Sequence, residues 1–208
     1  MSEQSHRLAA GGRIDRARPL AFTFNGRAYG GFGGDTLASA LLANGVHLVG
    51  RSFKYHRPRG ILSAGPEETN ALVQLGCGAA TDPNRPATTV ELREGLEARS
   101  QNCWPGPRFD LGSLADRASP LITAGFYYKT FMWPARLWPL YESIIRHAGG
   151  LGRSPTEPDP DTYEHVNAHC DVLIAGGGPT GLAAARAAAG TGARVIMAEQ
   201  DPAFGGTL

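Results

Sequence analysis

The chain has 208 residues, 42% of them hydrophobic, which is enough for one medium-sized core or two small ones. Its 20 basic and 19 acidic residues leave a formal charge of +1, so no global field attracts nucleic acid, acidic membranes or acidic substrates. No apolar run reaches the roughly 20 residues that span a bilayer, and the N-terminus lacks the apolar core of a signal peptide. We therefore expect a cytoplasmic protein without a nucleic-acid or membrane partner.

The first 18 residues are polar and rich in Gly and Arg, without apolar periodicity, and are predicted to be a tail that another surface must hold. From Leu20 the stretch LAFTFNGRAYGGFGG alternates apolar and polar residues around Asn25-Gly26, which is typical of a β-hairpin. Asp35 then precedes TLASALLANG, whose apolar residues share one helical face, so Asp35 is predicted to be the N-cap and Asn44-Gly45 the C-cap.

Further strand-like pieces lie in HLV, ILSAGPEETNALVQLG and TTVELREGL, each between turn residues. The hairpin, the helix and these pieces predict a small α+β module over residues 19–96. The basic stretch RSFKYHRPRG inside it could suggest a nucleic-acid patch. In a neutral protein, a loop that pairs with acidic groups of its own complex is the favoured interpretation.

Residues 97–168 are predicted to connect two domains. Helical pieces such as LGSLADRA and LWPLYESIIRHAG are expected in this segment, but its prolines break any longer element. The segment carries aromatic residues that need a surface to bury against, namely Phe126, Tyr127, Tyr128, Trp133 and Trp138. Tyr127, Tyr128 and Lys129 are interpreted as packing residues. The acidic, proline-rich run PTEPDPDTYEHVNAH reads as a linker. The three cysteines, Cys77, Cys103 and Cys170, have no metal-ligand or C-x-x-C spacing, and we expect no metal site.

Residues 169–208 have the order of a βαβ unit that binds dinucleotides. The buried-type strand DVLIA leads into Gly176, Gly178 and Gly181, which form G-x-G-x-x-G, and the helix LAAARAAAG follows. The first glycine permits the tight turn, the second lets a pyrophosphate approach the backbone, and the third lets helix and strand pack closely. The free N–H groups at the helix N-terminus favour an anion.

The second strand, RVIMA, ends at Glu199, about 20 residues beyond the glycines, where a carboxylate can accept hydrogen bonds from an adenosine ribose. Because an acidic side chain there repels a 2′-phosphate, NAD or FAD is favoured over NADP. A doubly wound domain needs more strands than these two, so we expect the chain to be the N-terminal piece of a longer polypeptide. No residue in it is a credible catalytic acid, base or nucleophile.

Three stretches resemble the α subunit of the heterotetrameric sarcosine oxidase family, and together they span nearly the whole chain. They are FTFNGRAYGGFGGDTLASALLANGVHLVGRSFKYHRPRGI, AGFYYKTFMWP and VLIAGGGPTGLAAARAAAGTGARVIMAEQDPAFGGTL. The resemblance implies a ferredoxin-like fold for the first module, followed by the start of an α/β Rossmann-type domain. In relatives that carry a [2Fe-2S] cluster, its ligands have the spacing C-x4-C-x2-C, and the equivalent positions here are Ser63, Glu68 and Ala71. None is a thiol, so we expect a clusterless, structural module.

The resemblance also implies NAD in this subunit, with FAD and FMN held elsewhere in a complex with β, γ and δ subunits. That complex converts sarcosine to glycine, formaldehyde and hydrogen peroxide, with folate as one-carbon acceptor. The loop would hold the pyrophosphate, the end of the second strand would line the ribose, and the next turn would approach the nucleotide. The residues concerned are Gly176, Gly178, Pro179, Thr180 and Gly181, then Glu199, Gln200 and Asp201, then Gly205, Gly206 and Thr207.

Two alternatives remain. One is an α-type subunit of a related dehydrogenase for opines, proline or glycine, against which the missing thiolates count, since relatives that carry electrons through an iron–sulfur module keep them. The other is a truncated, non-catalytic module that only docks a partner.

Overall fold

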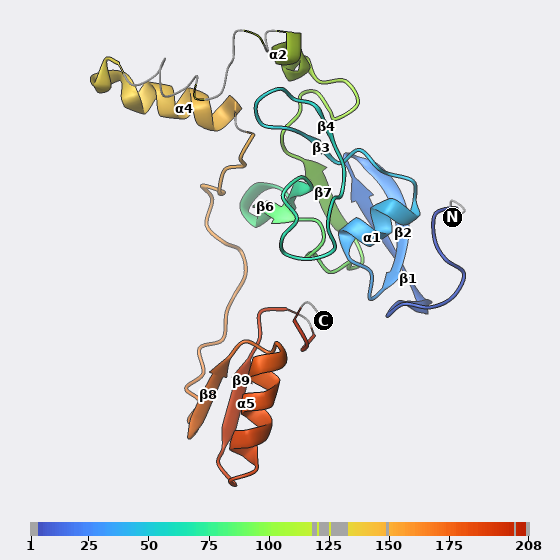
Figure 1. Cartoon of the computed structure of the whole chain (residues 1–208), viewed down its shortest axis with the longest axis vertical. Coiled ribbons are helices and arrows are strands. Elements are labelled where there is room, and N and C mark those ends of the chain that lie inside the picture. The colour runs from blue at the N-terminus through green and yellow to red at the C-terminus, as the bar shows by residue number, and fades with distance from the viewer. Residues whose placement is uncertain are drawn as a thin grey trace. The chain divides into compact units, whose positions relative to one another are not determined.

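The computed structural model describes residues 4–117, 120, 125, 133–148, 150–201 and 203–206. The chain forms two compact units, Met1–Pro160 and Asp161–Leu208 (Figure 1). The residues predicted to pack against another surface at positions 126–129, namely Phe126, Tyr127, Tyr128 and Lys129, lie outside the described residues. No described helix is both long and apolar enough to cross a bilayer.

The first unit begins with a β-hairpin of β1 (Asp15–Phe24) and β2 (Arg27–Gly33), which pair antiparallel. Asn25 and Gly26 at its turn have φ values of 52° and 75°, in the left-handed region that these two residue types tolerate best. The predicted hairpin is therefore confirmed. Strand β1 starts at Asp15, within the residues expected to form the tail.

The hairpin belongs to a five-stranded sheet with the order β2-β1-β7-β5-β6. Strand β7 (Leu96–Ser100) pairs parallel with β1, and β5 (Leu72–Leu75) pairs antiparallel with both β7 and the edge strand β6 (Asp82–Pro86). The parallel pair joins segments more than 70 residues apart in the sequence. Strand β7 therefore joins the hairpin to β5 and β6 in one sheet.

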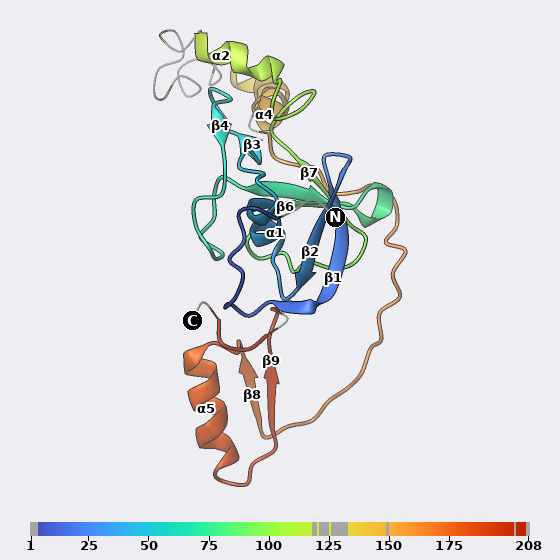
Figure 2. The same ribbon diagram turned by 90° about the vertical axis from the view of Figure 1, so that its right-hand side faces the viewer.

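Helix α1 (Leu37–Ala43) packs against this sheet (Figures 1 and 2). Its inner face buries Leu37 and Leu41 completely, next to Phe22 of β1 and Val73 of β5. Burying aliphatic and aromatic side chains of this size contributes about 1.5–3 kcal/mol each. These contacts make the α1–sheet interface a stabilising part of the core of the first unit.

The N-cap of α1 is Thr36, so the prediction of Asp35 is wrong. Thr36 Oγ1 accepts a hydrogen bond from Ser39 N at 3.1 Å, and Ser39 Oγ accepts one from Thr36 N at 3.0 Å, which completes a capping box. Asn44 is the C-cap and Gly45 follows with φ 72°, as predicted. The Asp35 carboxylate is committed to another contact.

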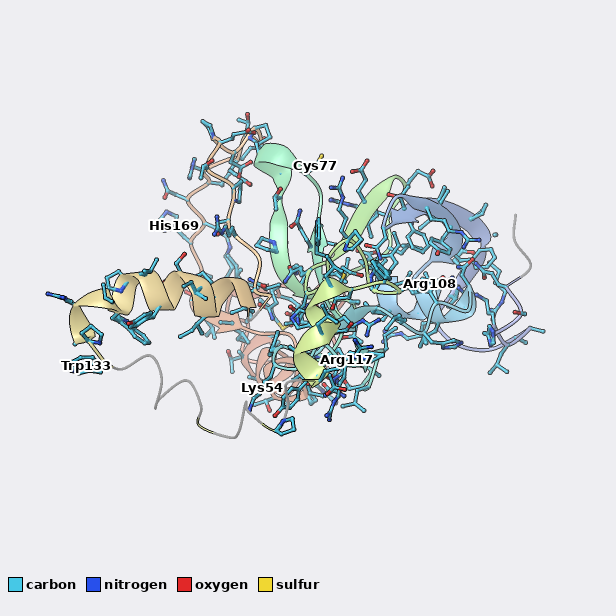
Figure 3. All side chains as sticks on the ribbon, turned by 90° about the horizontal axis from the view of Figure 1, so that it is seen from above. Lys54, Cys77, Arg108, Arg117, Trp133 and His169 are labelled. Atoms are coloured by element: carbon cyan, nitrogen blue, oxygen red, sulfur yellow. The ribbon has the colours of Figure 1, made fainter. Side chains whose placement is uncertain are left out.

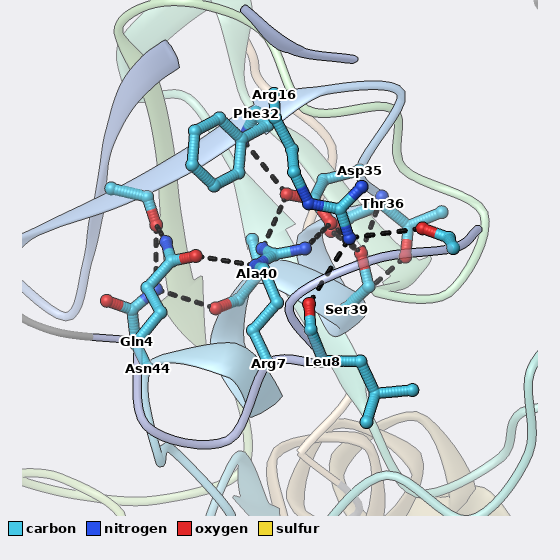
Figure 4. A network of polar contacts seen from close by, with 12 residues as sticks. Gln4, Arg7, Leu8, Arg16, Phe32, Asp35, Thr36, Ser39, Ala40 and Asn44 are labelled. Atoms are coloured by element: carbon cyan, nitrogen blue, oxygen red, sulfur yellow. Dashed lines mark hydrogen bonds and ion pairs between the residues drawn. The ribbon is translucent and has the colours of Figure 1, made fainter. Parts of the chain in front are cut away.

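That contact fixes the N-terminal segment to the sheet (Figure 4). The Arg7 guanidinium donates to both carboxylate oxygens of Asp35, at 3.0 and 2.7 Å, and Gln4 Nε2 donates to Gly30 O at 2.7 Å. Asp35 also accepts from Phe32 N and Ser39 Oγ, at 2.9 and 2.6 Å. The surface that the tail requires is thus the first unit itself.

The remaining elements of the first unit are short. Strands β3 (Gly50–Arg51) and β4 (Pro58–Arg59) lie at the two ends of the basic stretch. The described helical pieces are η1 (Gly78–Ala80), η2 (Leu111–Ser113), α2 (Leu114–Arg117), η3 (Ala135–Leu137) and α4 (Trp138–Ala148). Both helical pieces predicted between residues 97 and 168 are confirmed. Residues 151–170 have no helix or strand and are mostly exposed.

Carboxylates of the same chain pair with the basic stretch. Arg57 Nη2 lies 2.8 Å from an Asp116 oxygen, and His56 Nδ1 lies 2.7 Å from an oxygen of the buried Asp110. Burial raises the pKa of Asp110, but hydrogen bonds from Trp104 N, His56 and Gly112 N outweigh it, so that pKa lies below its usual value.

Figure 3 shows Cys77 on the surface; Cys77, Cys103 and Cys170 are all free thiols.

The second unit contains β8 (Val172–Ala175), α5 (Pro179–Ala189) and β9 (Val195–Ala198). The two strands are parallel, and Val172 pairs with Val195 while Ala175 pairs with Ala198. A parallel pair needs a crossover connection, which α5 provides. This is the βαβ order predicted for residues 169–208.

Candidate functional site

The candidate site is the loop between β8 and α5. Gly176 leaves the strand with φ 100°, a conformation that only glycine adopts without strain, and Gly178 is the N-cap of α5. Pro179 is the first helical residue, where its fixed φ and missing N–H are tolerated, and Thr180 follows it in the first turn. No described side chain caps this helix end. Its N–H groups are therefore suited to an external anion.

Two glycines of the loop differ in what the fold demands of them. A Cβ atom on Gly181 would collide with the carbonyl oxygen of Gly176, so the close approach of helix and loop requires a glycine there. Gly178 has φ −71°, which any residue adopts, and a Cβ atom on it would meet nothing within 4 Å. Nothing in the described part of the chain thus requires a glycine at position 178.

Glu199 follows β9 and reaches the loop. Its Oε2 accepts a hydrogen bond from Gly177 N at 2.5 Å, and its Oε1 accepts from Gln200 N at 2.7 Å and Asp201 N at 3.1 Å. The hydrogen bond from Gly177, followed by those from Asp201 and Gln200, holds the pKa of Glu199 below its usual value. The site thus combines N–H donors with an ionised carboxylate at the edge of the sheet.

A returning turn brings residues 203–206 to the same loop. Gly205 N donates to Gly177 O at 2.9 Å, and a Cβ atom on Gly206 would lie 3.3 Å from Gly178 Cα. Phe204 packs so close to Gly177 that a side chain at position 177 would collide with its ring. The structure therefore brings together all the expected site residues except Thr207, which lies outside the described residues.

Sequence reasoning missed Gly177 and Phe204. Gly177 carries the hydrogen bonds that join the loop to both Glu199 and the returning turn. The run of three glycines before Pro179 was a signal for it, because the fingerprint needs only two of the three. Phe204 had no signal in the sequence pattern.

Two family models match the chain. The model of a 2Fe-2S iron-sulfur cluster binding domain matches residues 17–103, and the model of an FAD dependent oxidoreductase matches residues 171–208. The first match covers the five-stranded sheet and its helix, and the second covers the βαβ unit.

Similar proteins extend over nearly the whole chain. "Sarcosine oxidase subunit alpha" of Rhizobium meliloti (strain 1021) is 61% identical over 205 residues, which are 98% of this chain and 21% of that protein. The proteins of the same name from Corynebacterium sp. strains U-96 and P-1 are 38% and 36% identical, over 96% and 98% of this chain. They are matched over 16% and 17% of their own length, so the chain spans about a fifth or less of these relatives.

A crystal structure of L-proline dehydrogenase from P. horikoshii covers 92% of the chain with a TM-score of 0.44 and 18% identity. That chain is matched over 26% of its length. A likeness at this level does not establish a shared fold.

The residues at the expected cluster positions do not fit an iron–sulfur cluster. The cluster needs thiolates, or imidazoles on one iron in the Rieske type, whereas Ser63, Glu68 and Ala71 offer a hydroxyl, a carboxylate and a methyl group. Among the described residues, no group of three His, Cys, Asp or Glu side chains could hold a metal ion. Residues 17–103 therefore match the model of an iron–sulfur domain, while the three expected ligand positions carry no thiolate.

Proposed function

Starting from the homology of this chain to the alpha subunits of sarcosine oxidase, we propose that its second unit binds the adenosine diphosphate half of a dinucleotide. The observation that carries this proposal is Gly178, whose φ and surroundings would accept a side chain. Close approach of a pyrophosphate to the backbone accounts for a glycine there. The uncapped N-terminus of α5 supplies the N–H donors.

Glu199 supports a nucleotide without a 2′-phosphate. Its carboxylate already accepts three backbone hydrogen bonds, and two carboxylate oxygens have capacity for more. The hydroxyl groups of a ribose at the end of β9 would donate hydrogen bonds to this carboxylate, whereas a 2′-phosphate would be repelled by its negative charge. We therefore propose NAD as the ligand of this unit, with Gln200 and Asp201 beside the ribose.

FAD is the second candidate, and the match of residues 171–208 to an FAD dependent oxidoreductase model favours it. NAD and FAD share the adenosine diphosphate that the glycine loop and Glu199 would bind. If the ligand is NAD, the flavins of the proposed complex lie outside this chain. If the ligand is FAD, one flavin of the complex is bound at the N-terminus of α5.

For the whole protein, we propose a subunit of a sarcosine oxidase complex with β, γ and δ partners. It would oxidise sarcosine with O₂ and water to glycine, formaldehyde and hydrogen peroxide, and pass formaldehyde to folate. The described residues would bind and orient the nucleotide, and none has a catalytic role. The absence of thiolates at positions 63, 68 and 71 counts against a dehydrogenase that sends electrons through this module.

The test is to identify the nucleotide released on denaturing the full-length subunit, purified with its partners, from wild type and two variants. We expect NAD in wild type and its loss in Gly178→Val, whose side chain would occupy the pyrophosphate position. Gly190→Ala, at the end of the same helix with φ −63°, is the matched control and should keep the nucleotide. Loss of FAD in Gly178→Val would identify FAD as the ligand, and unchanged nucleotide content in that variant would contradict binding at this loop.

A further inference from the structure

Glu68 is a buried carboxylate, 2% exposed, that has no basic side chain as a partner among the described ion pairs. Four backbone N–H groups of its own loop surround it instead. Oε2 accepts from Leu62 N at 2.6 Å and Ser63 N at 2.7 Å, and Oε1 accepts from Asn70 N at 2.6 Å and Ala71 N at 3.1 Å. Ser63 Oγ adds a weaker contact at 3.3 Å.

Convergent backbone N–H groups of this kind form a concave site for an anion. Burial alone would raise the pKa of Glu68, but the hydrogen bonds from Ser63, Asn70, Leu62 and Ala71 together outweigh it, and the pKa lies below its usual value. The side chain is therefore ionised at neutral pH, and its negative charge is balanced by the loop's own dipoles.

The loop lies within residues 17–103, which match the model of a 2Fe-2S iron-sulfur cluster binding domain, and the resemblance described above assigns Ser63, Glu68 and Ala71 to ligand positions. Glu68 hydrogen-bonds the backbone of residues 63 and 71, the other two expected ligand positions. We propose that the Glu68 carboxylate replaces the iron–sulfur cluster as the central anion of this loop. The loop is thus an anion-binding site that the chain itself occupies, and it accepts a small external carboxylate when the Glu68 side chain is removed.

The loop is tied to the core, so its conformation affects the stability of the whole first unit. Ala87 N donates to Ala71 O at 2.9 Å, and Thr88 Oγ1 donates to Gly65 O at 2.7 Å. The segment that contains Ala87 and Thr88 also contacts the N-terminus of α1, because Leu37 N donates to Val90 O at 2.8 Å. Removing the central anion leaves four N–H donors without their acceptor, next to this junction.

The test is thermal unfolding of the whole chain carrying Glu68→Ala, Glu68→Gln, or the control Glu67→Ala, whose side chain is exposed. We expect both Glu68 variants to lower Tm by at least about 4 °C, the shift that about 1 kcal/mol produces in a small domain, and Glu67→Ala to leave it nearly unchanged. Sodium formate should recover part of the loss in Glu68→Ala only. Sodium chloride at equal ionic strength controls for screening.

Acid supplies a second readout that does not depend on Glu68→Ala being able to fold. Because the folded-state pKa of Glu68 is below its ordinary value of 4.5, its contribution is complete above that value and is lost as the pH falls through the folded-state pKa. The Tm difference between wild type and Glu68→Gln should therefore shrink in this acidic range. Glu67→Gln should give no such convergence with wild type.

Four results would overturn the proposal. The first is that the Glu68 variants have the same Tm as Glu67→Ala, and the second is that the Tm difference between wild type and Glu68→Gln does not change with pH. The third is that formate does not raise the Tm of a folded Glu68→Ala, and the fourth is about two irons per chain by elemental analysis.

Discussion

Arg7 and Asp35 form an ion pair that joins the polar N-terminal segment to the first unit. The Arg7 side chain is 11% exposed and the Asp35 side chain is fully buried, and the guanidinium and the carboxylate make a bidentate contact. Arg7 also lies over the Phe32 ring, 5.2 Å from its centroid. Asp35 directly precedes Thr36, the N-cap of α1, so the pair links the N-terminal segment to the helix that packs on the sheet.

We expect Arg7→Ala to lower the free energy of unfolding by about 3–5 kcal/mol, since it leaves a buried carboxylate without its cation. Urea unfolding of the whole chain measures this change. Arg16→Ala is the matched control, because Arg16 is a half-buried arginine of β1 with no carboxylate partner among the described ion pairs, and its guanidinium donates to the carbonyls of Leu8 and Gly11. Equal, small losses for the two variants would show that the ion pair does not stabilise the fold.

At the scale of the elements, local signals in the sequence predicted those features that depend on neighbouring residues. Asn25-Gly26 fixed the hairpin, and the glycine spacing fixed the βαβ unit. Asp35 was misassigned as a cap because its partner Arg7 lies 28 residues away. Similarly, TTVELREGL was expected to contain a strand, yet of its residues Leu96 alone belongs to a described strand, β7. Val90 O instead accepts a hydrogen bond from Leu37 N, and Leu92 N donates to Asp35 O, on either side of the N-cap of α1.

In the candidate site too, the features that depend on neighbouring residues could be predicted, and the contacts between distant residues could not. The spacing of Gly176, Gly178 and Gly181 indicates the turn, and the end of the second strand indicates Glu199. The contact between Glu199 and Gly177 spans 22 residues and depends on how β9 aligns with the loop. No pattern in the sequence reports that alignment, so the part of Gly177 in holding the site together was not foreseen.

The two glycines of this loop should respond differently to the same substitution. Gly181→Ala should unfold the α5–β8 contact, because the new methyl group collides with the Gly176 carbonyl, whereas Gly178→Ala should leave the unit folded. Amide hydrogen exchange across residues 172–198 distinguishes them, with protection lost in the first variant and kept in the second. Equal protection in both would mean that the close approach at Gly181 is not needed.

At the scale of the whole molecule, the chain covers 21% of its Rhizobium meliloti relative. Within the described residues, the second unit leaves apolar side chains uncovered, with Leu173 65% and Leu182 38% exposed. Exposed leucines on both a strand and its crossover helix are typical of a unit that packs against further structure. Nucleotide affinity is therefore best measured in the full-length subunit.

The most direct measurement is a pair of dissociation constants, for NAD and for NADP, in the wild-type full-length subunit and in Glu199→Ala. Since the substitution removes a charged acceptor for the ribose hydroxyls, we expect NAD to bind roughly tenfold more weakly. The preference for NAD over NADP should shrink, because the charge that repels a 2′-phosphate is gone. If the proposed function is right, sarcosine turnover should persist in the proposed complex. Unchanged NAD affinity and an unchanged preference over NADP would contradict a nucleotide site at the end of β9.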